Sequence, residues 1–378
     1  MSLDDYVQHV SEADHALARL LRSPSENRGT IHTPREIAQQ PFLWRETARQ
    51  LKHQAPELRL FLESAGLYSS SDRTQLVFAG AGSSDYVGLS IADLLRVNLD
   101  TVSMNWPTTR LTVAPEAFFL PQQEYLLVHF SRSGNSPEST ATFNWTRKHR
   151  RETVRQLVIT CNREGKLAQL AREHANHAHL LVLHEAAHDG GLAMTSSFSS
   201  MVVAGQALAY VDRMDEFENI IEQTASAAEY ILRRFTDPIA ELAREPITRA
   251  FYLGNNDLLG AATESALKIQ ELTAGEIIAQ GEDTMAFRHG PISAVEADTL
   301  VSLLLSADPS IRRYETDLIE QFLEAFRELG ARLITVGPDT GNRPTADDIL
   351  SIDYGGADVP PYFQIGPAVV VGQLLGLF

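Results

Sequence analysis

Short apolar runs alternate with helical segments along this chain, and the alternation starts over midway. In the first half the runs cover residues 76–79, 125–130, 157–160 and 179–183, and helical patterns begin near Ser84, Ser136, Gly165 and Thr195. Strands that alternate with helices in this way predict a parallel sheet with helices on both faces.

The same alternation of strands and helices begins again with an apolar run over 250–253. Gly254 ends this run as Gly80 ends the first one. Further strands are predicted over 300–305, 332–336 and 349–352, with helices from about Leu258 and over 312–329. A chain of 378 residues also exceeds the ~250–300 residues that one hydrophobic core usually serves. We therefore predict an α/β protein with a helical N-terminal segment (1–55) and two similar domains (56–225 and 226–378).

Composition narrows the class of protein. The hydrophobic share of 44% and the charged share of 21% are those of a soluble globular protein. The net charge of −17 disfavours nucleic acid as a partner, because phosphate backbones repel it. We expect no membrane span, since no apolar stretch reaches ~20 residues. The acidic N-terminus lacks a signal core, and the lone Cys161 suits a reducing compartment, so we expect a cytoplasmic protein.

A serine-rich segment between a predicted strand and helix is the first candidate for ligand binding. Ser131, Arg132, Ser133 and Ser136 lie in it, and Pro137 occupies the first position of the helix. Such a turn presents backbone N–H groups and the positive end of a helix dipole, which suits a phosphate group. A plain serine and glycine turn that caps a helix remains the alternative.

A second small-residue turn, Gly80-Ala-Gly-Ser-Ser84, ends the first predicted strand. Ligands of open α/β sheets bind at this edge. Asp85 stands where a dinucleotide-binding motif needs its third glycine, so we do not expect a nucleotide. The second half has no counterpart of the serine-rich segment, which indicates one phosphate site per chain.

Three charged residues recur on one side of the helix predicted after Gly254. Glu264, Lys268 and Glu271 stand at positions i, i+4 and i+7 and share a helix face. Taken alone, such a stripe is typical of a solvated helix surface.

The segment His184-Glu-Ala-Ala-His188 satisfies the zinc-protease pattern. That pattern needs a continuous helix, whereas here it follows an apolar strand run and meets Gly190 and Gly191 at once. We interpret it as a loop and expect no metal.

Three segments together resemble the substrate-cradling loops of the sugar isomerase (SIS) domain family. They are Gly80-Ala-Gly-Ser-Ser84, Ser131-Arg-Ser-Gly-Asn-Ser136 and Ala193-Met-Thr-Ser-Ser197. The resemblance runs from about Glu36 to Pro291, and within the family it is greatest to the galactosamine-6-phosphate deaminase/isomerases, also called tagatose-6-phosphate ketose/aldose isomerases. It implies two flavodoxin-like three-layer domains. Phosphate contacts are then expected from Ser84, Ser131, Arg132, Ser133 and Ser136, and sugar contacts from Gly82, Ser83, Ala193, Met194 and Thr195.

The resemblance also assigns acid and base roles. The helix segment Glu264 to Glu271 is similar to the one that carries the proton-transferring glutamate in glucosamine-6-phosphate synthase, and Glu271 matches that base. Lys268 and Glu264 belong to the same catalytic group. His289, in a Phe-Arg-His-Gly-Pro turn, matches the histidine that opens the sugar ring and reaches into the neighbouring subunit, which implies a homodimer. Neither the proton transfer nor the ring opening requires a metal or a diffusible cofactor.

The implied activity converts a 2-amino-2-deoxyhexose 6-phosphate to a ketose 6-phosphate and ammonia. Galactosamine 6-phosphate is the preferred substrate that the resemblance implies. The alternatives are a plain aldose/ketose isomerase, a fructosamine-phosphate deglycase and a non-catalytic sugar-phosphate sensor. The first ~55 residues are too short and too helical for a glutaminase domain, which favours degradation. Two departures bear on the substrate and on turnover. Ile292 replaces a lysine usual in this branch, and the family continues past the position of Phe378 into a loop that closes over the sugar.

Overall fold

The computed structural model describes residues 1–26, 29–68, 74–339 and 349–378. These residues form two parallel sheets of five strands each, so the α/β prediction with two similar halves is confirmed. The chain divides into two compact units. We call Leu43–Asp189 with Ser196–Asn219 the first-sheet unit, and Met1–Phe42, Gly190–Thr195 and Ile220–Phe378 the second-sheet unit.

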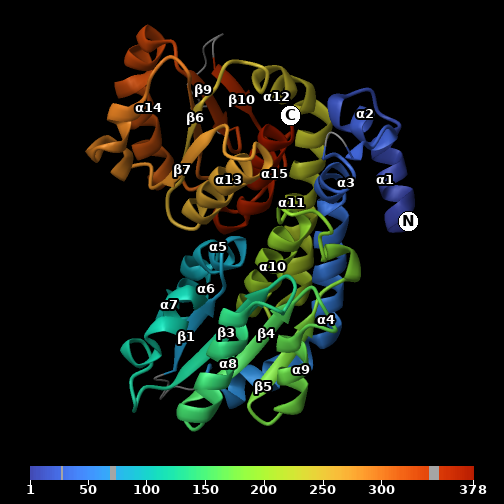
Figure 1. Ribbon diagram of the computed structural model, residues 1–378, viewed down its shortest axis with the longest axis vertical. Coiled ribbons are helices and arrows are strands. Elements are labelled where there is room, and N and C mark those ends of the chain that lie inside the picture. Colours follow the sequence, from blue (N-terminus) through green and yellow to red (C-terminus); the bar gives the residue numbers. More distant parts are fainter. Residues whose placement is uncertain (27–28, 69–73, 340–348) are drawn as a thin grey trace. The chain divides into compact units, whose positions relative to one another are not determined.

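The first-sheet unit has the strand order β2-β1-β3-β4-β5 and helices on both faces of the sheet (Figure 1). On one face Leu127 packs with Leu111 and Phe143 packs with Val158, which brings α7, α8 and α9 onto the sheet. On the other face Phe130 approaches Gly205 of α10. The strands are β1 (Gln75–Ala79), β2 (Ser103–Asn105), β3 (Tyr125–Ser131), β4 (Val154–Thr160) and β5 (Ala178–Val182). The helices are α4 (Gln40–Ser64), α5 (Ser83–Leu89), α6 (Ala92–Leu99), α7 (Thr108–Val113), η2 (Pro115–Ala117), α8 (Pro137–His149), α9 (Lys166–Glu173), η3 (Glu185–Ala187), α10 (Ser196–Gln206), η4 (Ala207–Ala209) and α11 (Met214–Arg234); α4 begins and α11 ends in the other unit.

The second-sheet unit repeats this plan with the order β10-β9-β8-β6-β7. One face packs Val301 and Leu333 against Ile319 and Phe326 of α14, and the close approach of Gly281 to Thr263 places α13 on the edge strand β7. The strands are β6 (Arg249–Leu253), β7 (Ile278–Glu282), β8 (Thr299–Leu304), β9 (Arg332–Val336) and β10 (Ile349–Ile352). The helices are α1 (Leu3–Ser11), α2 (Ala16–Arg22), α3 (Thr33–Ala38), α12 (Thr236–Leu242), α13 (Leu258–Leu272), η5 (Ala286–His289), η6 (Pro291–Ala294), α14 (Pro309–Leu329), η7 (Pro361–Phe363) and α15 (Ile365–Leu377).

The expected N-terminal helices are present and belong to the second-sheet unit. The Gln40 side chain, at the start of α4, donates to Gln373 of α15 at 2.7 Å, and the N–H of Ala16 donates to Asp237 of α12 at 2.8 Å. Both glutamines are fully buried. Residues distant in sequence therefore join the N-terminal helices to the C-terminal part of the chain.

Two strands were absent from the sequence prediction, β2 and β7. Both lie at the edge of their sheet, and β2 has only three residues. In β7 the residues Ile278 and Gln280 are exposed and none is fully buried. Neither strand therefore has the continuous apolar run that marks a central parallel strand.

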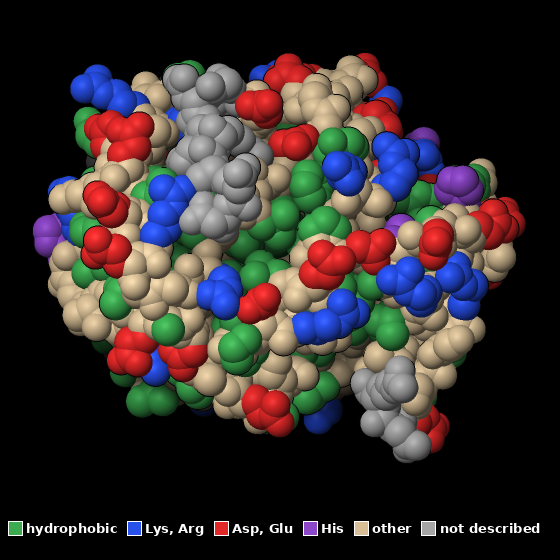
Figure 2. Space-filling view, turned by 90° about the horizontal axis from the view of Figure 1, so that it is seen from above, with side chains coloured by type: hydrophobic (Ala, Val, Ile, Leu, Met, Phe, Trp, Pro, Cys, Tyr) green, Lys and Arg blue, Asp and Glu red, His purple; other side chains and the backbone are tan. Residues whose placement is uncertain are grey.

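Acidic and basic side chains are interspersed on the face shown in Figure 2, rather than gathered by sign. No helix among the described residues combines the length and the apolar character needed to cross a membrane.

Candidate active site

The serine-rich loop joins β3 to α8 at the carboxyl edge of the first sheet. Ser136 is the N-cap of α8, its hydroxyl accepts from the N–H of Ser139 at 3.2 Å, and Pro137 follows at the first helical position, as predicted. The Ser131 hydroxyl accepts from the N–H of Gly134 at 3.0 Å. Gly134 has φ +66°, a conformation that glycine adopts without strain. The loop therefore has a fixed turn at the positive end of a thirteen-residue helix.

The next loop along the sheet supports this turn. Asn162, which follows β4, donates its side-chain N–H to the carbonyl of Ser133 at 2.8 Å. The N–H of Lys166 donates to the Asn135 side chain at 3.1 Å, and the N–H of Leu167 donates to the carbonyl of Gly134 at 2.9 Å. Asn162 was missed by sequence reasoning, although its place directly after a central strand was a usable signal.

The loop's N–H groups of Ser133 and Ser136 have no protein acceptor among the residues that the structure describes. Ser133 and Ser136 are half-buried, and so is Arg132. Backbone donors, hydroxyls and a guanidinium are the groups that bind a phosphate dianion. The geometry of this loop therefore fits the phosphate role expected for it.

The small-residue turn after β1 lies beside the serine-rich loop, because β1 pairs with β3. Ser83 and Ser84 are buried at the start of α5, and Gly82 precedes them with φ +57°. Asp85 accepts from the Asn105 side chain at 2.9 Å, and burial raises the pKa of Asp85 to about 6. Below about pH 6 this carboxyl is mainly protonated and repels a neighbouring anion less than an ordinary aspartate does.

The third predicted segment precedes α10. Ala193 and Thr195 are buried and Met194 is half-buried. Cys161, one residue beyond β4, is also buried, and burial raises the pKa of its thiol. The thiol therefore stays protonated, which agrees with a packing role rather than a nucleophilic one.

The charged stripe of α13 is buried, not solvated. The side chains of Glu264 and Lys268 are 0% and 1% exposed, whereas that of Glu271 is 30% exposed. The Lys268 ammonium lies 3.4 Å from Glu264 Oε1 and also contacts Glu271 Oε2. One buried cation thus sits between two carboxylates, and only Glu271 reaches solvent. The solvated helix face that is typical of such a stripe is therefore not what this helix presents.

His289 lies on the exposed turn that follows β7. Phe287 anchors the turn by packing on Phe251, with ring centroids 5.1 Å apart, while Arg288, His289 and Gly290 are exposed. No hydrogen bond or ion pair among the described residues joins His289 to the stripe of α13. Ile292, in the place of the family lysine, packs on the core beneath the turn.

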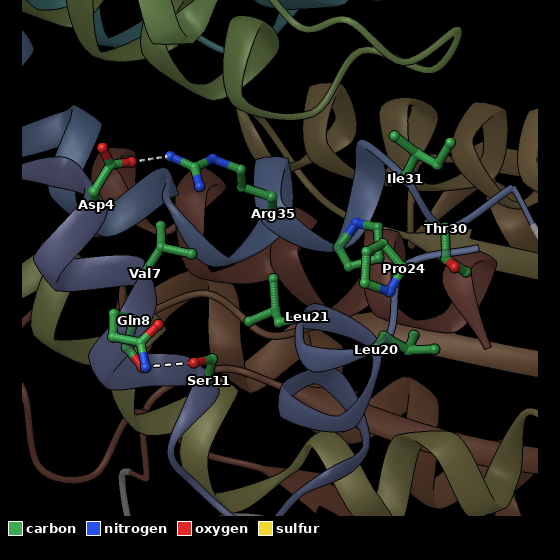
Figure 3. A pocket seen from close by; sticks show the side chains of 11 residues that line it. Asp4, Val7, Gln8, Ser11, Leu20, Leu21, Pro24, Thr30, Ile31 and Arg35 are labelled. Atoms are coloured by element: carbon green, nitrogen blue, oxygen red, sulfur yellow. Dashed lines mark hydrogen bonds and ion pairs between the residues drawn. The ribbon is translucent and has the colours of Figure 1, made fainter. Parts of the chain in front are cut away.

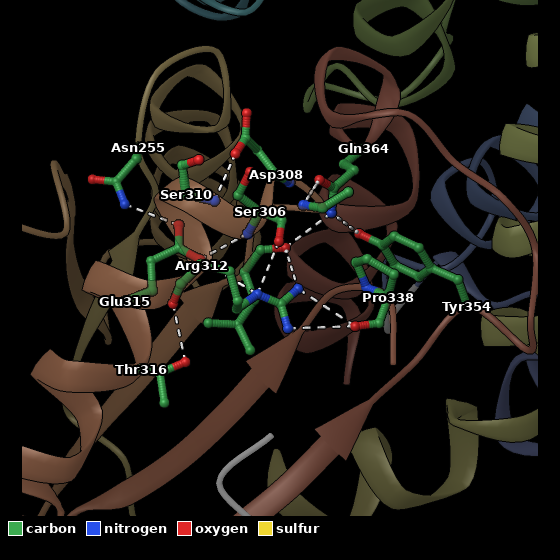
Figure 4. Close-up of polar contacts among 12 residues, drawn as sticks. Asn255, Ser306, Asp308, Ser310, Arg312, Glu315, Thr316, Pro338, Tyr354 and Gln364 are labelled. Carbon is green, nitrogen blue, oxygen red and sulfur yellow. Dashed lines mark hydrogen bonds and ion pairs between the residues drawn. The ribbon is translucent and has the colours of Figure 1, made fainter. Parts of the chain in front are cut away.

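A network of polar contacts lies at the carboxyl edge of the second sheet (Figure 4). The fully buried Glu315 carboxylate accepts from the Asn255 side chain at 2.9 Å and from the N–H of Ser306 at 2.8 Å. Burial raises the pKa of Glu315. The Arg312 guanidinium donates to the carbonyls of Ser306 and Leu305 at 2.8 and 3.2 Å.

This network occupies the position that corresponds to the serine-rich loop. Ser306 follows β8 and Pro309 opens α14, as Ser133 follows β3 and Pro137 opens α8. The N–H of Ala307 donates to the Gln364 side chain at 2.5 Å. The backbone N–H groups of Ser306 and Ala307, which would face a phosphate, are thus both bonded to side chains of the protein. The prediction of a single phosphate site in the first half is consistent with this arrangement.

The pattern His184-Glu-Ala-Ala-His188 forms a single 3₁₀ turn after β5, as the loop interpretation expects. The His184 side chain accepts from the N–H of Ala186 at 3.1 Å and so caps that turn. Within the described ranges, no three His, Cys, Asp or Glu side chains are grouped as a metal site requires.

A separate pocket of about 400 Å³ lies among the N-terminal helices (Figure 3). The ion pair between Asp4 and Arg35, at 2.6 Å, lies beside Val7 and Leu21 of its lining. None of the predicted site residues lines this pocket.

Comparisons with known proteins agree with the fold. No family model matches the chain. The chain is 36% identical to a Streptomyces coelicolor protein named as a candidate D-galactosamine-6-phosphate deaminase, over 92% of this chain and 88% of that protein. It is 34% identical to the Escherichia coli D-galactosamine-6-phosphate deaminase AgaS, over 76% of this chain and 74% of that protein. The crystal structure of tagatose-6-phosphate ketose/aldose isomerase from Escherichia coli matches with a TM-score of 0.82 and 30% identity, covering 91% of each chain. The chain therefore belongs to the SIS family of sugar isomerases.

Proposed function

We propose that the chain is an enzyme that converts a 2-amino-2-deoxyhexose 6-phosphate to a ketose 6-phosphate and ammonia, with galactosamine 6-phosphate as the preferred substrate. The observation that carries the proposal is the stripe on α13, where buried Lys268 contacts both the buried Glu264 and the partly exposed carboxylate of Glu271. Relatives at 34% and 36% identity bear the deaminase name. The phosphate is assigned to Ser84 and to the loop of Ser131, Arg132, Ser133 and Ser136.

The reaction needs a base, a ring-opening acid and water. His289 is assigned to ring opening, since histidine titrates near neutral pH. Glu271 then takes the proton from C2 of the open aldehyde, which leaves an enolamine across C1 and C2. That proton returns at C1 and, overall, one proton passes from the nitrogen to O1, which gives an imine at C2. Water adds to the imine, and ammonia leaves as the ketose carbonyl forms.

Glu271→Gln tests the base. We expect this variant to keep its affinity for the sugar phosphate and to lose nearly all turnover and all exchange of the C2 proton with solvent deuterium, because only the accepting carboxylate is removed. Glu276→Gln is the matched control, an exposed glutamate shortly after the same helix. Exchange that persists in Glu271→Gln would move the base elsewhere.

Ser133→Ala and Arg132→Ala test the phosphate loop. A charge-assisted hydrogen bond suggests a loss of about 1.5 to 3 kcal/mol in binding for the arginine, expressed mainly in KM. Arg151→Ala is the control, because Arg151 is exposed near the opposite end of β4. Unchanged phosphate affinity in both loop variants would place the phosphate elsewhere.

A plain aldose/ketose isomerase is the second candidate, supported by the name of the Escherichia coli structure at 30% identity. Both reactions share the C2 proton transfer and differ in the release of ammonia. A coupled ammonia assay with galactosamine and glucosamine 6-phosphates separates them. Ketose/aldose interconversion without ammonia from either amino sugar would favour the isomerase.

We also propose a homodimer in which His289 serves the neighbouring subunit, supported by its exposed position. Sedimentation of the wild type, and mixing of Glu271→Gln with His289→Ala chains, test this. Mixed dimers that recover activity would support sharing of sites between subunits.

A cytoplasmic location is proposed as well, supported by the free buried thiol of Cys161.

A further inference from the structure

The segment Gly190–Thr195 leaves the first-sheet unit after Asp189 and returns to it at Ser196. It contains Ala193 and Thr195, for which the family resemblance implies contacts with the sugar. The segment has no helix or strand of its own, and Leu192 within it is 83% exposed. Buried carboxylates bond at both ends of this segment.

Asp189 fixes the two ends of the segment to each other. Its Oδ1 accepts from the Ser196 hydroxyl at 2.5 Å, and its Oδ2 accepts from the N–H and the hydroxyl of Ser197 at 2.9 and 2.5 Å. Asp189 is 6% exposed, and both serines are fully buried. The carboxylate thus closes residues 190–195 into a loop and caps the positive end of α10.

Glu36 holds the start of the same loop. This residue lies on α3 and is 6% exposed. Its Oε1 accepts from the N–H groups of Gly190 and Gly191, at 2.7 and 3.0 Å. Two charge-assisted hydrogen bonds in a buried setting are stronger than bonds between neutral groups.

Glycine at position 191 is what permits this approach. A Cβ at Gly191 would lie 2.9 Å from Glu36 Oε2 and 3.2 Å from the Thr33 hydroxyl. Contacts under 3.0 Å do not occur for real Cβ atoms, so a larger residue would displace the carboxylate from the turn.

We infer that Glu36 and Asp189 are positioning residues that fix the loop of residues 190–195 so that it presents Ala193 to Thr195 to the sugar of the substrate. The inference rests on the proposed function for the identity of that ligand. A loop that is ordered before binding spares the entropy cost of ordering it on binding. Glu36 bonds to the start of the loop from α3, and the phosphate loop has its own turn at Ser131 and Gly134, so we expect the effect of Glu36→Gln to fall on the sugar and not on the phosphate.

The test compares two ligands by calorimetry, galactosamine 6-phosphate and inorganic phosphate, in wild type, Glu36→Gln and Asp189→Asn. We expect each variant to lose about 10-fold in affinity for the sugar phosphate, the factor expected for ordering one or two loop residues. In Glu36→Gln, affinity for inorganic phosphate should stay within about twofold of wild type, because the loop after β3 is intact. Deuterium exchange should rise in peptides that cover 190–195 and not in those that cover 131–136.

Gly191→Ala is a second variant that replaces neither Glu36 nor Asp189, and it should reproduce the loss by crowding the Glu36 carboxylate out of the turn. Glu229→Gln is the matched control, since Glu229 accepts from Tyr6 in the same unit, away from the loop. Equal weakening of both ligands in Glu36→Gln would mean general destabilisation and would overturn the inference, as would unchanged affinity for both ligands in either variant. A wild type that binds the sugar phosphate no better than phosphate would overturn it too. Failure of the proposed function alone looks different: binding of the sugar phosphate without ammonia release.

Discussion

Replacing Lys268 by methionine tests how the stripe of α13 is held together. Methionine keeps most of the lysine stem and removes the ammonium. Glu264 is fully buried and lies 3.4 Å from that ammonium, so it would keep a buried charge without its cation. Glu271 is 30% exposed and can be hydrated instead.

The expected cost follows from this burial. Removing one partner of a buried ion pair costs about 3 to 5 kcal/mol, whereas an exposed pair is worth about 0 to 1 kcal/mol. Adding Glu264→Gln to Lys268→Met removes the stranded charge while keeping the side-chain shape. The double variant should therefore recover at least about 1 kcal/mol relative to Lys268→Met alone.

Urea unfolding followed by far-UV circular dichroism measures these changes. Tryptophan fluorescence would not report on them directly, because Trp44, Trp106 and Trp145 all belong to the first-sheet unit and Lys268 belongs to the other. A loss below about 1 kcal/mol for Lys268→Met, or strict additivity of the two changes, would refute the buried ion-pair explanation.

Three further predictions concern pH and metal. His15 caps α2 by accepting from the N–H of Ala18 at 3.1 Å, and burial lowers its pKa from 6.5. The contribution of His15 to the stability of the fold is therefore complete above pH 6.5 and declines as the pH falls below that value. His15→Asn keeps a capping acceptor, so its melting temperature should change less with pH below 6.5 than that of the wild type. Because the pKa of Asp85 is raised from 3.8 to about 6, its contribution is present below pH 3.8 and is lost as the pH rises through 6. Asp85→Asn should thus unfold at a higher temperature than wild type above pH 6 and gain nothing near pH 3.8; an equal gain at both pH values would contradict this explanation. Chelators should leave activity unchanged, and stoichiometric zinc that is lost on His184→Ala would contradict our interpretation of that segment as a loop.

The central strands and the start of each site helix were predictable from sequence, because their signals are local. Continuous apolar runs mark β1, β3, β4 and β6, and the Ser136-Pro137 pair marks the start of α8. The edge strand β7 escaped, since Ile278 and its neighbours are exposed and carry no such run. The i, i+4 and i+7 spacing is a local signal too, and it is sufficient to place Glu264, Lys268 and Glu271 on one helix face.

Spacing did not say whether that face is buried, and burial changes its chemistry. Glycines of α15 allow the close packing on α13: a Cβ at Gly372 would lie 2.4 Å from Ser265 Cβ, and one at Gly376 would lie 3.1 Å from the carbonyl of Lys268. The partners are about a hundred residues apart in the chain. Only the packed structure shows that a stripe typical of solvent-facing helices is enclosed.

The same reason separates the loops that were predicted from the residues that hold them. Helical and strand periodicity report which side of an element is apolar, over a window of a few residues. They carry no information on which distant element covers that side. The bonds from Gly190 and Gly191 to Glu36, and from Asn255 to Glu315 at the edge of the second sheet, were therefore decided by tertiary packing alone.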